Sequence, residues 1–220
     1  MNESCLKVKG IFLDLDGTIV DSTEAYVEAA KKAFQAIGLQ TPETKTALEI
    51  PRRIEQGFSM ADLTNGETKE FLKAYFQAWY IVSREKTKLI PNVSETLKVL
   101  SQKAKLALIT MRHVPKQAII TELECFGISQ YFTHVVTALD TAKPKPSPEA
   151  LIKCVQALDV NICDCIITGD SVNDIRAGKA AGAKTVAVLS GLFQYEELIK
   201  EHPDLILNDV TALPQFIERF

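Results

Sequence analysis

The order of apolar and polar positions changes character near residue 90. From Pro91 onward, short apolar runs alternate with stretches whose apolar residues recur at helical spacing. Strands that alternate with helices predict a parallel sheet with helices on both faces. The expected strands cover residues 9–15, 106–109, 134–137, 165–168, 185–189 and 205–207. The predicted fold class is therefore α/β, with a doubly wound, Rossmann-like parallel sheet as its core.

The segment between the first two expected strands has a different pattern. Residues 20–88 stay in a helical register, with Asn65-Gly66 marking a turn and one apolar stripe running from Phe71 to Val82. We expect a small all-helical cap domain at residues 20–88, inserted after the first strand. Residues 1–19 and 89–220 then form the α/β core domain.

Composition narrows the class of protein. The chain has 220 residues, with 25 Lys and Arg against 28 Asp and Glu, and a net charge of −3. This balance predicts no binding of nucleic acid or of an acidic membrane surface. We find no apolar run of signal-peptide or membrane-spanning length, and the five cysteines form no CxxC pair. A cytoplasmic monomer or homodimer without a disulfide framework is the expectation.

Candidate chemistry lies where the expected strands end. Asp14 and Asp16 close the first strand, and charged groups are costly to bury unless they are paired or bind a metal. Parallel strands bring their carboxyl ends to one edge, where ligands bind. Each polar residue there has a structural explanation when taken alone, such as a cap or a loop. The prediction of a phosphotransfer site rests on the whole ordered set, Asp14, Asp16, Thr110, Lys143, Asp170 and Asp174.

The ordered motifs resemble a known family. FLDLDGTIVDS, LIT, KPKPSPE and GDSVNDIRAGKAAGA resemble the motifs of the haloacid dehalogenase superfamily of phosphohydrolases. The similarity is greatest to the phosphoglycolate phosphatase-like branch, which carries a helical cap, and it covers the chain apart from the cap interior. It implies a Mg²⁺-dependent phosphatase that hydrolyses a small phosphorylated metabolite through an aspartyl-phosphate intermediate.

The resemblance also implies a role for each motif residue. Asp14 would be the nucleophile, and Asp16 would be the general acid and then the base. The phosphate would be held by Thr110, Met111 and Lys143. Mg²⁺ would be held by Asp14, the backbone carbonyl of Asp16, Asp170 and Asp174.

Substrate contacts are less well defined by the motifs. Relatives commonly place Asn and a basic residue after the motif Thr, whereas this chain has Met111, Arg112 and His113. Arg112 and His113 are possible specificity residues, although a surface position also explains His113. Arg52 and Arg53 of the expected cap could bind a carboxylate or a second phosphate, or lie on a solvated helix face.

Two other functions fit the same motifs. A phosphomutase related to β-phosphoglucomutase would use the same aspartyl-phosphate but return the phosphoryl group to a sugar. A catalytically silent regulatory or binding protein could also be built on this fold, since fold does not imply function. The four acidic residues at positions 14, 16, 170 and 174 argue against the silent protein.

Overall fold

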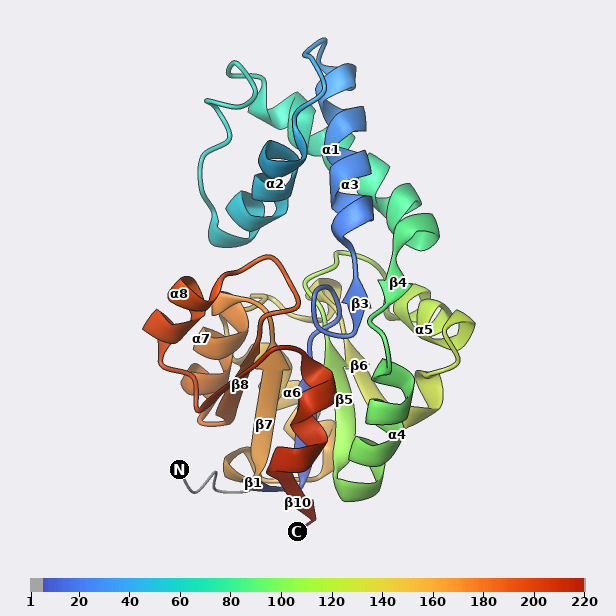
Figure 1. The fold of residues 1–220 in the computed structure, drawn as a ribbon, viewed down its shortest axis with the longest axis vertical. Coiled ribbons are helices and arrows are strands. Elements are labelled where there is room, and N and C mark those ends of the chain that lie inside the picture. Colours follow the sequence, from blue (N-terminus) through green and yellow to red (C-terminus); the bar gives the residue numbers. More distant parts are fainter. Residues whose placement is uncertain (1–5, 220) are drawn as a thin grey trace. The chain divides into compact units, whose positions relative to one another are not determined.

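A six-stranded parallel sheet forms the centre of the larger part of the molecule. The computed structural model describes residues 6–219, and Figure 1 labels its helices and strands where there is room. The strand order is β6-β5-β2-β7-β8-β9, and every neighbouring pair is parallel. The strands are β2 (Gly10–Leu13), β5 (Lys105–Ile109), β6 (Phe132–Val136), β7 (Cys165–Gly169), β8 (Lys184–Val188) and β9 (Leu205–Leu207). The predicted α/β, Rossmann-like fold class is confirmed.

The chain builds the sheet outward from β2 in both directions. β5 and β6 lie on one side of β2, and β7, β8 and β9 lie on the other. In register, Leu13 of β2 pairs with Leu108 of β5 and with Thr168 of β7. The three strands therefore end at the same edge. A doubly wound sheet binds its ligand at this edge, beside the strand where the order reverses.

Each face of the sheet is covered by its own set of helices. Ile11 and Leu13 lie in a core cluster with residues of α4, α5 and the 3₁₀ segment η5. Phe12, between them, lies in a second cluster with α6 and α7. Burial on both faces explains why β2 is apolar at every position after Gly10. The helices of this part are α4 (Val93–Lys103), α5 (Lys116–Cys125), α6 (Glu149–Leu158), α7 (Val172–Ala181) and α8 (Tyr195–Leu198).

Short elements connect these helices and strands. Five 3₁₀ segments are η1 (Ser129–Tyr131), η2 (Ala138–Asp140), η3 (Ile162–Asp164), η4 (Ile199–Glu201) and η5 (Val210–Phe216). Two pairs of strands were not expected from the sequence, β1 (Leu6–Val8) with β10 (Ile217–Arg219), and β3 (Val20–Asp21) with β4 (Lys88–Leu89). These strands have only two or three residues each, too few for an alternating pattern to reveal them.

A helical unit is inserted between β2 and α4. The chain divides into two compact units, residues 1–20 with 89–220, and residues 21–88. The second unit contains α1 (Thr23–Ala36), α2 (Thr44–Gln56) and α3 (Thr68–Lys86). Its core includes Phe34 and Phe71, whose rings meet edge to face with centroids 5.1 Å apart. The domain boundaries expected from the sequence, 20–88 for a cap domain and 1–19 with 89–220 for a core domain, remain a prediction.

Two further observations bear on the sequence-based expectations. Across residues 6–219, no helix combines the length and the apolar character that crossing a membrane requires. Cys125 and Cys163 are exposed thiols, and Cys154 and Cys165 are buried thiols. Cys5 lies outside the described residues.

Candidate active site

Three buried carboxylates meet at the carboxyl edge of the sheet. Asp14 follows β2, Asp170 follows β7, and Asp174 lies in the first turn of α7. One carboxylate oxygen from each lies within 4.8 Å of the others. All three residues are at most 6% exposed. Carboxylates held this close in the interior repel one another, so they require positive charge nearby.

Lys145 supplies a positive charge to this cluster. Its Nζ donates hydrogen bonds to Asp14 Oδ1 at 2.6 Å and to Asp174 Oδ1 at 2.5 Å. The side chain is 2% exposed, so both ion pairs are shielded from water. The ammonium therefore links the residue that follows β2 to the first turn of α7.

The assignment of Lys143 to the site is corrected by this geometry. Lys143 is exposed, and its backbone N–H donates to Glu149 Oε2 at 3.1 Å. Lys145 occupies the turn closed by the hydrogen bond from the Ser147 N–H to the Pro144 carbonyl, and its side chain enters the cluster. The sequence reads K-P-K-P here, so each lysine precedes a proline and motif spacing alone does not separate them.

Backbone N–H groups also bind the carboxylates of Asp174 and Asp170. Asp174 Oδ2 accepts a hydrogen bond from the Ser171 N–H at 3.2 Å, and the Ser171 hydroxyl oxygen accepts from the Asp174 N–H at 3.4 Å. This capping box fixes Asp174 at the start of α7, where the positive end of the helix dipole favours a carboxylate. Asp170 Oδ2 accepts from the Leu192 N–H at 2.9 Å. Both carboxylates are thus oriented before any ligand binds.

Burial and charge change the protonation of the central pair. Burial raises the pKa of Asp14 to about 8, although Lys145 acts in the opposite direction, and the negative charge of Asp174 raises it further. Burial alone would lower the pKa of Lys145, but the attraction of Asp14 and Asp174 outweighs it and raises that pKa above its usual range. Lys145 is therefore a permanent cation here.

The grouping of three carboxylates fits a divalent cation. Lys145 bonds Asp14 and Asp174, so two carboxylates of the cluster share one positive charge. Oxygen ligands of this kind suit Mg²⁺, which completes its coordination with water. Asp14, Asp170 and Asp174 could therefore hold a metal ion. The side chain of Asp16 is not part of this cluster.

The loop after Asp14 passes close to the cluster. Gly17 adopts a left-handed conformation with φ of 78°, and its N–H donates to the Val20 carbonyl at 2.7 Å. A Cβ at this position would come within 2.7 Å of the Asp170 carboxylate. The Ser190 hydroxyl donates to the Gly17 carbonyl at 2.7 Å. Only glycine suits this conformation and this close approach.

Asp16 is held by an arginine that the sequence had offered for substrate binding. Arg112 donates from Nε to Asp16 Oδ2 at 2.8 Å and from Nη2 to Asp16 Oδ1 at 2.6 Å. Its Nη1 donates to Glu122 Oε2 at 2.6 Å. Because the guanidinium is buried between two carboxylates, the interpretation of Arg112 as a substrate-specificity residue is corrected. Sequence reasoning gave no role to Glu122, which lies on α5 outside all of the motifs.

The residues that follow β5 differ in their exposure to solvent. Thr110 follows β5 directly and is 3% exposed, and its hydroxyl oxygen accepts from the Arg112 N–H at 3.2 Å. Met111 is half-buried, and His113 is exposed. The structure therefore places Thr110 at the same sheet edge as Asp14, while His113 faces solvent.

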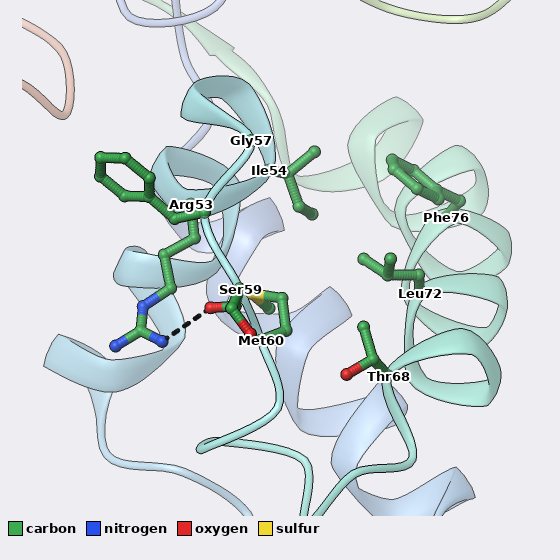
Figure 2. A pocket seen from close by; sticks show the side chains of 9 residues that line it. Arg53, Ile54, Gly57, Ser59, Met60, Thr68, Leu72 and Phe76 are labelled. Atoms are coloured by element: carbon green, nitrogen blue, oxygen red, sulfur yellow. Dashed lines mark hydrogen bonds between the residues drawn. The ribbon is translucent and has the colours of Figure 1, made fainter.

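In the helical unit, Arg53 forms hydrogen bonds with other residues of the same unit. Its Nη1 donates to Asp62 Oδ1 at 2.6 Å and to the Ser59 carbonyl at 3.0 Å, and the latter bond is drawn in Figure 2. Figure 2 also shows the pocket of about 280 Å³ beside it, with Ile54, Leu72 and Phe76 among its lining residues. Arg52 is half-buried on α2. All residues that line this pocket belong to the unit of residues 21–88.

Comparison with known proteins places these observations in a family. Residues 11–188 match the sequence profile described as haloacid dehalogenase-like hydrolase. A phosphoglycolate phosphatase from Photobacterium profundum is 30% identical over 94% of each chain. A phosphoglycolate phosphatase from Escherichia coli is 29% identical over 94% of this chain and 91% of the relative.

Solved structures agree on the fold. A haloacid dehalogenase-like family hydrolase from Streptococcus pneumoniae aligns with a TM-score of 0.78 over 98% of this chain and 99% of its own, at 20% identity. The family profile and the curated relatives show an enzyme of the phosphatase class, and the solved structures show the fold. As its motifs predicted, the chain belongs to the haloacid dehalogenase-like hydrolase family, and its curated relatives include members of the phosphoglycolate phosphatase-like branch.

Proposed function

We propose that this protein is a Mg²⁺-dependent phosphatase that hydrolyses a small phosphorylated metabolite through an aspartyl-phosphate on Asp14. One observation carries the proposal: a buried ammonium, that of Lys145, bonds both Asp14 and Asp174 within a cluster of three carboxylates. Three buried carboxylates with a lysine ammonium among them suit a site that also takes up a metal cation and a phosphate ester.

In the first half-reaction, Asp14 attacks phosphorus. A carboxylate oxygen of Asp14 forms the new P–O bond while the bond from phosphorus to the ester oxygen breaks. The Lys145 ammonium, 2.6 Å from Asp14, holds the attacking carboxylate in place and offsets negative charge on the transferred group. The Thr110 hydroxyl, at the end of the neighbouring strand, would donate a hydrogen bond to a phosphoryl oxygen.

Asp16 would transfer the proton in both half-reactions. It donates a proton to the departing ester oxygen, which leaves as an alcohol. In the second half-reaction, Asp16 accepts a proton from water as that water attacks the aspartyl-phosphate. The P–O bond to Asp14 breaks, inorganic phosphate leaves, and both carboxyl groups return to their initial states. Splitting hydrolysis into these two steps lowers the barrier that each must cross.

The metal would be held by Asp14, Asp170 and Asp174, with the Asp16 backbone carbonyl as a further oxygen ligand. When bound, Mg²⁺ would neutralise charge on the phosphoryl oxygens. The hydrogen bonds from Leu192 to Asp170 and from Ser171 to Asp174 keep two of the carboxylates oriented for it.

The substrate is proposed at the level of its class. Relatives that match 94% of this chain are named as phosphoglycolate phosphatases. We therefore propose small phosphorylated metabolites, with phosphoglycolate and sugar phosphates as candidates. The helical unit of residues 21–88 would select among them, and Arg52 stays a candidate for that selection. Cytoplasmic location and a monomeric or homodimeric state remain predictions.

The decisive test is trapping of the phosphoenzyme. Purified protein is incubated with p-nitrophenyl phosphate and Mg²⁺, quenched in acid, and digested for mass spectrometry. One phosphoryl group is expected on the peptide that contains Asp14, together with release of p-nitrophenol that a chelator stops. Asp14→Asn should give neither product. Asp62→Asn, an exposed position in the helical unit, is the matched control and should retain both.

The same preparation distinguishes the two alternatives. Glucose 1-phosphate with a trace of the bisphosphate would be isomerised by a phosphomutase, whereas a phosphatase releases inorganic phosphate from it or leaves it unchanged. A catalytically silent protein would hydrolyse none of a panel of phosphorylated metabolites. Hydrolysis that persists in Asp14→Asn would exclude Asp14 as the nucleophile.

A further inference from the structure

Arg112 forms a buried ion pair with Asp16. Two nitrogens of the guanidinium meet both carboxylate oxygens, at 2.8 Å from Nε and 2.6 Å from Nη2. The third nitrogen, Nη1, meets Glu122 Oε2 at 2.6 Å. The Arg112 side chain is 6% exposed, and those of Asp16 and Glu122 are each 13% exposed. Two parallel hydrogen bonds of this kind fix the plane of a carboxylate as well as its position.

The backbone of Arg112 is tied to neighbouring parts of the same sheet edge. Its N–H donates to Thr110 Oγ1 at 3.2 Å, and its carbonyl accepts from the Ala138 N–H at 3.2 Å. Glu122, on α5, receives the guanidinium at the far end of the side chain. Arg112 is therefore held at its backbone and at its tip, and little freedom is left to the side chain.

The two acids after β2 are thus held by different cations. Lys145 bonds Asp14, and Arg112 bonds Asp16. Successive side chains of an extended chain point to opposite sides of it. If β2 continued past Leu13, the side chains of Asp14 and Asp16 would therefore lie on the same side of the strand. Lys145 comes from the loop before α6, and Arg112 comes from the loop after β5. Because each carboxylate has its own cation, the two do not compete for one partner.

We propose that Arg112 is a positioning residue that orients the Asp16 carboxylate for proton transfer, and that Glu122 holds Arg112 in that position. This inference rests on the proposed function, in which Asp16 transfers the proton. It assigns Arg112 no contact with the substrate. An arginine that acts only through Asp16 changes the steps in which a proton moves and leaves substrate binding unaltered.

Leaving groups that differ in their need for a proton separate these effects. p-Nitrophenolate departs without protonation, whereas the alkoxide of glycerol 2-phosphate needs a proton. In Arg112→Lys, kcat for glycerol 2-phosphate should fall by about 100-fold, the scale of general acid–base catalysis, with KM nearly unchanged. With p-nitrophenyl phosphate, a rapid burst of p-nitrophenol should appear, because phosphorylation stays fast while hydrolysis of the phosphoenzyme slows. Arg176→Lys is the matched control, since Arg176 pairs in the same bidentate way with Glu201 on the surface.

A double-mutant cycle tests whether Arg112 acts through Asp16. Asp16→Asn should show the same selective loss, and adding Arg112→Lys to it should cost little more. If Asp16→Asn shows no selective loss, the proposed role of Asp16 fails and the inference about Arg112 fails with it. If Asp16→Asn shows the loss but Arg112→Lys does not, the positioning role alone is overturned. Equal slowing of the phosphorylation step with both esters, which would leave p-nitrophenyl phosphate without a burst, or a rise in KM for glycerol 2-phosphate, would also overturn it.

A milder variant guards against a simple folding defect. Glu122→Gln keeps the size of the side chain but weakens its hold on Arg112, so it should reproduce the leaving-group effect at smaller amplitude. Thermal unfolding of each variant shows whether the fold persists. A Glu122→Gln protein that unfolds like the parent and shows no leaving-group effect removes Glu122 from the proposal.

Discussion

Lys145 Nζ lies 2.6 Å from Asp14 Oδ1, across 131 positions of sequence, with both side chains withdrawn from solvent. The same nitrogen lies 2.5 Å from Asp174 Oδ1. Breaking a buried pair by removing one partner leaves an uncompensated charge, which costs more than the pair contributes when it is intact. Lys145 is therefore the residue whose removal should disturb the site most directly.

The first prediction contrasts two lysines that lie two positions apart. Lys145→Met should lower kcat by about 100- to 1000-fold, the range found when a preorganised electrostatic contact is removed. Lys143→Met should leave kcat within about twofold, because an exposed side chain away from special features contributes little. Steady-state hydrolysis of p-nitrophenyl phosphate with saturating Mg²⁺ measures both. Circular dichroism checks that each variant is folded, and a larger loss in Lys143→Met would reverse the assignment.

This pair also shows where sequence reasoning reached its limit. Asp14 and Asp170 were expected to meet because each follows an apolar strand of a parallel sheet, and they lie in one cluster in the structure. The choice between Lys143 and Lys145 depended on a turn among three prolines, and neither periodicity nor motif spacing describes that turn. Nothing local to Arg112 revealed that it would pair with Asp16, 96 positions away. Contacts of this kind are set by the folded sheet, not by neighbouring residues.

The second prediction concerns metal binding and pH. In the metal-free protein, burial raises the pKa of Asp14 from its usual 3.8 to about 8. The folded state therefore holds a proton that the unfolded state releases, so the Asp14 contribution to stability is complete below pH 3.8 and is lost as pH rises through about 8.

Mg²⁺ requires the ionised carboxylate of Asp14, so Mg²⁺ binding should expel this proton. The Kd for Mg²⁺ should therefore rise about tenfold for each unit by which the pH drops below about 8, and it should be constant above that pH.

Isothermal titration calorimetry of the metal-stripped protein measures that linkage. Titrations in two buffers with different ionisation enthalpies give the number of protons released. Asp14→Asn should release none and should lose the dependence on pH, whereas the exposed Asp62→Asn should behave like the parent protein. A Kd for Mg²⁺ that stays constant between about pH 6 and pH 8 would contradict the prediction.

The third prediction concerns Gly191, whose backbone lies close to the carboxylate of Asp170. A Cβ on Gly191 would lie 1.8 Å from Asp170 Oδ2, so Gly191→Ala must displace the carboxylate or the loop that carries the Leu192 N–H. We expect the Mg²⁺ concentration for half-maximal activity to rise by about 10- to 100-fold, as when a group that orients a metal ligand is lost. Gly127→Ala serves as control, because it meets no atoms within 4 Å and only strains a left-handed turn. It should lower the melting temperature without changing the Mg²⁺ requirement.

The fourth prediction separates the two arginines on α2 that the sequence had grouped together. Arg53 donates to Asp62 at 2.6 Å and to the Ser59 carbonyl at 3.0 Å, and its Nη2 lies 3.4 Å from Glu49 Oε2. A guanidinium engaged by three groups of its own unit has little left to offer a substrate, so we expect Arg53 to stabilise the loop after α2. Arg53→Gln should lower the free energy of unfolding by about 1 kcal/mol or less, the usual scale for a partly exposed ion pair. Its KM for phosphoglycolate should stay unchanged.

Arg52→Gln provides the comparison within the same helix. If Arg52 contacts the substrate, this variant should raise KM for phosphoglycolate while KM for p-nitrophenyl phosphate, which has no carboxylate, stays the same. Steady-state kinetics with both esters and urea unfolding of both variants give the full contrast. A raised KM in Arg53→Gln at unchanged stability would return Arg53 to the substrate site, since an arginine that only stabilises its loop cannot distinguish the two esters.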